Sequence, residues 1–119
     1  MSMTPQFELV PDGDAHTFCL RGELDLATAA ELLSALHPVL RAGTRLRLKL
    51  SDLDFLDCSG LHALVSAAEA LLPGGSLILE APTGEVAKVL ELVRADLIPG
   101  VEITEGAERA TVQDGTVAP

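Results

Sequence analysis

The amino-acid sequence predicts a single α/β domain with one mixed, mostly parallel sheet and helices packed mainly on one face. First, segments with strand and helix periodicity follow one another in the order β-β-α-β-α-β-α-β, with a short terminal helix left open. Second, strands that alternate with helices need crossover connections, which produce parallel, right-handed βαβ units. Third, 119 residues are enough for one domain with a buried core.

The chain begins with two strands and a helix. The segments "FELV" and "HTFCLRG" are separated by the turn sequence "PDGD", which predicts a hairpin and therefore one antiparallel pair. After them, Thr28 and Glu31 match a capping box, so the helix is expected to start at Ala29. Pro38 is expected to kink or end this helix, because it lacks the N–H that a helix interior needs. The apolar stripe of the helix consists of Leu26, Ala29, Leu33, Leu36 and Leu40.

Residues 44–53 alternate between Leu and basic residues, which predicts a strand with two unlike faces. Because three cations are costly to bury without partners, their face is expected to meet solvent or a binding partner. The alternation also predicts that one face of the sheet is only partly covered. The basic face consists of Arg45, Arg47 and Lys49, and the apolar face of Leu46, Leu48 and Leu50.

The C-terminal half continues the alternation of helices and strands. The domain is expected to span residues 1–112, with the open terminal helix at 104–112, and to be followed by a disordered tail at 113–119. The elements expected before it are a loop over 54–58, a helix that Pro73-Gly74-Gly75 stops, a strand over 76–81, a helix over 82–97 and a strand over 101–103.

Composition and charge exclude several classes of function. Eighteen acidic residues against eight basic ones give a formal net charge of −10, which repels nucleic acid and anionic lipid. Trp and Tyr are absent, so base stacking is disfavoured. No apolar run is long enough to insert into a membrane, and the N-terminus does not resemble a signal peptide. Cys19 and Cys58 fit neither a disulfide framework nor a zinc site, so we expect a cytoplasmic protein with reduced thiols.

The stretch "DLDFLDCSGLHALVSAAEALL" at residues 52–72 places three acids, a Cys and a Ser just before an apolar helix. A hydrolase built on Ser59 and His62 lacks the GxSxG motif, and the acids around Cys58 disfavour the thiolate of a cysteine nucleophile. The spacing of Asp52, Asp54 and Asp57 gives only a weak match to a metal loop. Nucleotide and dinucleotide motifs are absent. We therefore expect no enzymatic activity, no cofactor and no metal ion.

A phosphorylation switch accounts for every residue of this stretch. Ser59 is expected where the loop becomes a helix, with the N–H groups of Gly60 and Leu61 free. The positive end of the helix dipole would tolerate a phosphate there. A docking partner would instead meet added bulk and roughly 1.5 to 2 further negative charges beside Asp57. The loop would then allow binding in one state and block it in the other.

Two segments resemble the STAS-domain family of anti-sigma-factor antagonists. They are "GELDLATA" at residues 22–29 and "LRLKLSDLDFLDCSGLHAL" at residues 46–64. In that family a strand ends in Gly-Glu-hydrophobic-Asp, and a loop with Asp-Ser-Ser-Gly-Leu opens a later helix. Both motifs occur here in the expected order, and the resemblance runs through essentially the whole chain. It implies a STAS-like fold.

The resemblance also implies partners and a site. In the family, the Ser before the Gly, here Ser59, is phosphorylated by a partner that is both anti-sigma factor and ATP-dependent serine kinase. The unmodified antagonist binds this anti-sigma factor and frees the sigma factor, and a metal-dependent serine phosphatase restores the unmodified form. The family protein is thus the substrate and not the enzyme. The implied partner-binding residues are Glu23, Asp25, Asp57, Cys58, Ser59 and Gly60.

This sequence departs from the family pattern at Cys58, which replaces the first Ser of the usual pair and removes an alternative phosphorylation site. A redox function of Cys58 is less expected than a small filler, given its acidic neighbours. Other STAS domains are subunits of lipid-transport ABC systems or scaffolds of stress-sensing complexes, and both functions stay open as alternatives. A weak homodimer through the basic face or the first strand also stays open.

Overall fold

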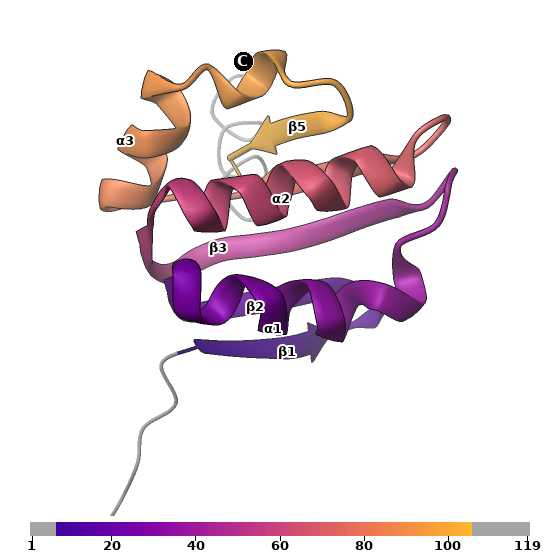
Figure 1. Ribbon diagram of the computed structural model, residues 1–119, viewed down its shortest axis with the longest axis horizontal. Coiled ribbons are helices and arrows are strands. Elements are labelled where there is room, and N and C mark those ends of the chain that lie inside the picture. The colour runs from indigo at the N-terminus through magenta and orange to yellow at the C-terminus, as the bar shows by residue number, and fades with distance from the viewer. Residues whose placement is uncertain (1–6, 106–119) are drawn as a thin grey trace, which may run out of the picture.

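The protein forms a five-stranded sheet with three α-helices, as seen in a computed structural model that describes residues 7–105 (Figure 1). The strand order is β1-β2-β3-β4-β5, with β1 antiparallel to β2 and every later pair parallel. The predicted fold class is therefore confirmed. The strands are β1 (Phe7–Asp12), β2 (Asp14–Leu24), β3 (Arg45–Leu56), β4 (Ser76–Glu80) and β5 (Val101–Thr104). The helices are α1 (Leu26–Leu36), α2 (Cys58–Leu71) and α3 (Gly84–Leu92), with 3-10 turns η1 (His37–Val39) and η2 (Ala95–Leu97).

The core lies between the sheet and the helices. Helices α1 and α2 lie side by side over one face of the sheet, and both begin at the end of the sheet where the parallel strands finish (Figure 1). Because the chain lacks Trp and Tyr, aliphatic side chains fill the interior. The fully buried large side chains are all leucines, at positions 20, 24, 32, 36, 46, 48, 50, 64, 71, 77, 79 and 90.

Strand β3 is longer than expected, and its extra length sets the geometry of the site. The predicted loop over 54–58 is wrong, because the strand continues to Leu56. Pairing with β2 shifts register twice, and β3 contributes one extra residue at each shift. After these bulges Leu24 and Leu56 are paired, so both strands end level with each other.

Helix boundaries differ from the predictions where side-chain caps decide them. Helix α1 begins at Leu26 and not at Ala29, because Asp25 forms a capping box with Thr28 in place of the expected pair of Thr28 and Glu31. Leu26 consequently lies outside the core and is 78% exposed. Pro38 does end the helix early, as predicted, and lies within η1.

The third helix is shorter than the expected span of 82–97. Helix α3 ends at Leu92. Arg94, which lies between α3 and η2, has a left-handed backbone with φ 52°, and this change of direction separates the two helices. The domain boundary expected at residue 112 and the tail expected at 113–119 lie outside the described residues, as does nearly all of the open helix at 104–112. Within residues 7–105, no helix is long and apolar enough to cross a membrane.

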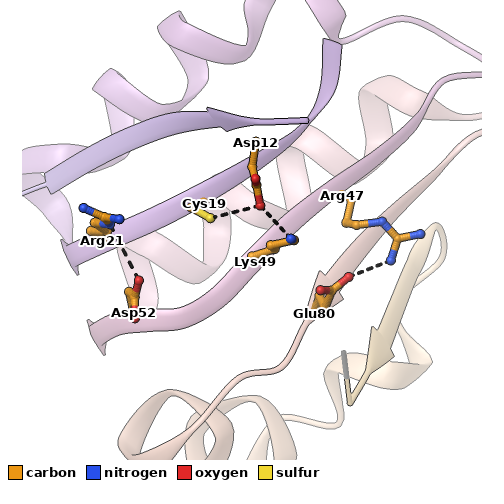
Figure 2. Close-up of polar contacts among 7 residues, drawn as sticks. All are labelled: Asp12, Cys19, Arg21, Arg47, Lys49, Asp52 and Glu80. Carbon is orange, nitrogen blue, oxygen red and sulfur yellow. Dashed lines mark hydrogen bonds and ion pairs between the residues drawn. The ribbon is translucent and has the colours of Figure 1, made fainter. Parts of the chain in front are cut away.

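The sheet face opposite α1 and α2 carries a row of ion pairs that join residues of different strands (Figure 2). Lys49 lies 2.6 Å from Asp12, and this hydrogen bond holds the pKa of the Asp12 carboxyl below its usual range. Arg47 lies 2.7 Å from Glu80, whose side chain is only 7% exposed. The basic face therefore meets acids of the same chain, which its sequence pattern did not predict. The two other pairs are Arg21 with Asp52 at 3.6 Å and Arg45 with Glu102 at 3.5 Å.

Candidate functional site at the helix N-termini

The two motifs singled out in the sequence meet at the end of the sheet. Leu24 and Leu56 are paired neighbours on β2 and β3, and the next residue on each strand is an aspartate that caps a helix. The backbone N–H of Asp57 donates to the carbonyl oxygen of Leu24 at 3.3 Å. Asp25 and Asp57 therefore lie side by side, each at the start of its own helix.

Asp57, and not Ser59, is the N-cap of α2. Its Oδ1 accepts a hydrogen bond from the N–H of Gly60 at 2.9 Å, and its carbonyl oxygen accepts one from the N–H of Leu61 at 2.8 Å. The expectation that these two N–H groups are free is wrong, because the cap occupies both. Ser59 is the second residue of the helix and is partly exposed.

The other motif is held rigidly by a capping box. Oδ1 of Asp25 accepts hydrogen bonds from the N–H groups of Ala27 at 3.0 Å and Thr28 at 3.2 Å. The Asp25 N–H donates back to the Thr28 hydroxyl at 2.9 Å, and that hydroxyl donates to the carbonyl of Glu23 at 2.8 Å. Thr28 is buried, so the backbone of residues 23–28 is tied to the core.

Gly60 fixes the distance between α2 and β2. A Cβ at this position would overlap the carbonyl oxygen of Leu24 and would lie 2.9 Å from its Cγ. Only glycine lets the first turn of α2 approach Leu24 this closely. Gly60 is itself buried, so the structure assigns it to packing, which positions the neighbouring Ser59.

The acids at this end of the sheet differ from those on the open face. Within residues 7–105, none of the ion pairs involves Glu23, Asp25, Asp54 or Asp57. By contrast, Asp12, Asp52, Glu80 and Glu102 each lie within 4 Å of a cation of the same chain. Glu23, Asp54 and Cys58 are exposed, while Asp25, Asp57 and Ser59 are partly exposed. The negative charge around Ser59 is therefore available to a molecule that docks there.

The arrangement offers no activated nucleophile in the part of the chain that the structure describes. No hydrogen bond joins Ser59 or Cys58 to His62, which is exposed on the same helix. Asp52 pairs with Arg21, and no group of three or more His, Cys, Asp or Glu side chains within residues 7–105 could hold a metal ion.

Sequence reasoning missed Leu24 and gave Thr28 the wrong capping partner. Leu24 supplies the carbonyl group against which both Asp57 and Gly60 are placed, and a buried strand leucine carries no local signal of that function. Thr28 completes the Asp25 cap, and the spacing of Asp25 and Thr28 is the signal that identifies it.

Comparison with known proteins places this architecture in a family. The STAS domain model matches residues 6–108, and the chain belongs to the STAS domain family. A crystal structure of a candidate anti-sigma factor antagonist from Thermotoga maritima shares the fold, with a TM-score of 0.67, 22% identity, and coverage of 90% of this chain and 92% of that one. The anti-sigma factor antagonist SpoIIAA, solved in its unphosphorylated form, gives a TM-score of 0.62 and 24% identity, covering 95% of this chain and 97% of that one. No curated protein sequence matches significantly.

Proposed function

We propose that this protein is an anti-sigma-factor antagonist whose binding is switched off by phosphorylation of Ser59. The unphosphorylated form binds an anti-sigma factor that is also a serine kinase, and thereby frees the sigma factor. A serine phosphatase restores the binding form, and the exchange takes place in the cytoplasm. The protein acts as the substrate of the kinase, not as an enzyme.

The observation that carries this proposal is the placement of Ser59 in the first turn of α2, partly exposed and among acids without cations. The fold is shared with SpoIIAA and with the Thermotoga maritima protein, and the two motifs of the chain meet around this serine. The rigid caps support a docking surface that is formed before binding, which lowers the entropic cost of association.

The caps also explain how a phosphate would act. Asp57 already occupies the N–H groups of Gly60 and Leu61, so a phosphate on Ser59 cannot replace it there without breaking the cap. A phosphate on the partly exposed Ser59 would therefore lie beside the cap, where a docked partner would meet it. It adds roughly 1.5 to 2 negative charges next to the Asp57 carboxylate. A partner surface that accepts the neutral hydroxyl meets both bulk and unbalanced charge.

A kinase assay tests the acceptor. The full-length protein is incubated with ATP and each purified serine-kinase anti-sigma factor of the same organism, and its intact mass is measured. We expect one phosphate on the wild type and none on Ser59→Ala. Ser66→Ala is the matched control, because Ser66 is an exposed serine on the same helix, and it should be labelled like the wild type. Equal labelling of wild type and Ser59→Ala would refute the assignment.

A binding assay tests the charge mechanism separately. Ser59→Asp should weaken the complex with the anti-sigma factor at least about tenfold, because a partner surface that accepts a neutral hydroxyl would have to take a larger, charged side chain that it does not balance. Ser66→Asp adds the same charge to the same helix away from its N-terminus and should change the Kd less than about twofold. Identical effects of the two substitutions would count against a local switch and in favour of a general charge effect.

A further inference from the structure

An exposed leucine lies beside the acids of the proposed docking surface. Leu26 is the first residue of α1 and directly follows the N-cap Asp25. Its 78% exposure makes it the most exposed large apolar side chain within residues 7–105. The other helix of the site begins at Cys58, directly after Asp57. Since Asp25 and Asp57 lie side by side, Leu26 projects from the same end of the sheet as Ser59.

The exposure of Leu26 follows from the capping geometry and not from a lack of core positions. The capping box fixes the first turn of α1 so that Thr28, Leu32 and Leu36 face the core, which leaves the first residue pointing away from it. Leu26 belongs neither to the buried core nor to the partly buried side chains that pack against it within residues 7–105. Packing of the described core therefore does not account for a leucine at this position.

We infer that Leu26 is the apolar anchor of the docking surface and inserts into an apolar socket of the anti-sigma factor, with basic residues of that partner around the socket. The inference rests on the proposed function and adds the chemistry of the partner surface. Charge complementarity supports this occupant: the surrounding acids Glu23, Asp25 and Asp57 lack cations within the described chain, so the partner supplies them. An apolar centre with a charged rim is the usual composition of a protein–protein interface.

Leu26 and Ser59 then have different functions in the same surface. Burial of Leu26 supplies affinity, and the charge state of Ser59 decides whether the surface can dock. Leu26 touches no reacting atom, so it should contribute equally to binding before and during phosphoryl transfer. Its loss should raise the KM of the kinase for this substrate and leave kcat unchanged.

The test compares two leucines of nearly equal exposure. Leu26→Ala is measured against Leu92→Ala, because Leu92 is 76% exposed at the last residue of α3. The Kd of the unphosphorylated full-length protein for the purified serine-kinase anti-sigma factor is determined by calorimetry. We expect Leu26→Ala to weaken binding about tenfold or more, and Leu92→Ala to change it less than about twofold. Leu26→Met, which keeps an apolar side chain of similar length, should stay within about threefold of the wild type.

Each outcome decides between the two proposals. If the wild type binds and Ser59→Asp weakens the complex, but Leu26→Ala binds like the wild type, the anchor is refuted and the proposed function stands. Equal losses for Leu26→Ala and Leu92→Ala also overturn the anchor, because they indicate nonspecific apolar contact. If the wild type binds none of the organism's serine-kinase anti-sigma factors, the proposed function fails and the anchor fails with it. Both alanine variants should keep the thermal midpoint of the wild type, since neither leucine is buried.

Discussion

Substitution of Gly60 by alanine should destabilise the protein, although alanine is normally the better helix former. In an unhindered helix, Gly→Ala stabilises by about 1 kcal/mol. Here the added Cβ overlaps the carbonyl oxygen of Leu24 and lies 2.9 Å from both the carbonyl carbon and Cγ of the same residue. Leu24 is fully buried and cannot move aside, so the first turn of α2 must shift outward.

The expected loss in the free energy of unfolding follows from the contacts that the shift of this turn disturbs. Overpacking of a rigid interior costs about 1–3 kcal/mol. The movement also strains the hydrogen bond from the Asp57 N–H to the Leu24 carbonyl. It strains the Asp57 cap of the first turn as well, and such a cap contributes about 1 kcal/mol to stability. After subtraction of the gain in helix propensity, the free energy of unfolding should fall by about 1–3 kcal/mol. For a domain of this size, that lowers Tm by roughly 4–12 °C.

Circular dichroism at the helix band is the appropriate probe, because the chain has no Trp or Tyr for fluorescence. Ser66→Ala serves as the control, since it raises helix propensity at an exposed position of α2 without a new contact, and its Tm should stay the same or rise. The displaced first turn of Gly60→Ala should also slow phosphorylation of Ser59. A Tm equal to or above that of the wild type would show that the close approach of Gly60 and Leu24 does not constrain the site.

Two further predictions each compare a buried group with an exposed one, first in two arginine–glutamate ion pairs and then in the two cysteine thiols. Arg47→Met should lower the free energy of unfolding by about 2–3 kcal/mol in denaturant titrations, because it leaves the buried Glu80 carboxylate without its 2.7 Å partner. Arg45→Met, whose partner carboxylate is 49% exposed, should cost less than about 0.5 kcal/mol, and equal losses would contradict this account. Of the two thiols, exposed Cys58 should react first with iodoacetamide at mildly alkaline pH. Cys19 should react more slowly, because burial and a neighbouring carboxylate raise the pKa of its thiol; mass mapping that shows Cys19 modified first would refute this.

The order of elements and the fold class could be predicted from the sequence, because hydrophobic periodicity specifies both. The alternation of Leu46, Leu48 and Leu50 with basic residues identified β3, and the Pro38 stop of α1 was also recognised. These features depend on a few neighbouring residues, so a single sequence contains the information that they require.

The boundaries at the site could not be predicted, because contacts between distant segments determine them. Two bulges let β3 continue to Leu56, and they become visible only when β3 is paired with β2. Thr28 was expected to cap the first helix and Ser59 to lie where the second begins, but Asp25 and Asp57, three and two residues earlier, are the N-caps, because both aspartates precede the apolar periodicity of their helices. The ion pair of Arg47 with Glu80 likewise joins residues from neighbouring strands that no local pattern connects.

The residues brought together around Ser59 were identified from two motifs, and their juxtaposition is a consequence of the sheet register. Pairing of Leu24 with Leu56 places Asp25 beside Asp57, as a shared surface requires. What sequence reasoning did not foresee is that Asp57 accepts hydrogen bonds from the Gly60 and Leu61 N–H groups that a phosphate was expected to meet. A phosphate on Ser59 would lie beside this cap and its carboxylate, which supports the argument that added bulk and unbalanced charge exclude a partner.

The central claim is that one phosphate on Ser59 prevents docking without unfolding the protein. The most direct measurement is the Kd for the anti-sigma factor before and after complete phosphorylation by that kinase, with ATP removed and Tm measured on both forms. We expect an unchanged fold and binding at least about a hundredfold weaker after phosphorylation. Equal affinity of the two forms, or a loss of binding explained by unfolding, would contradict it.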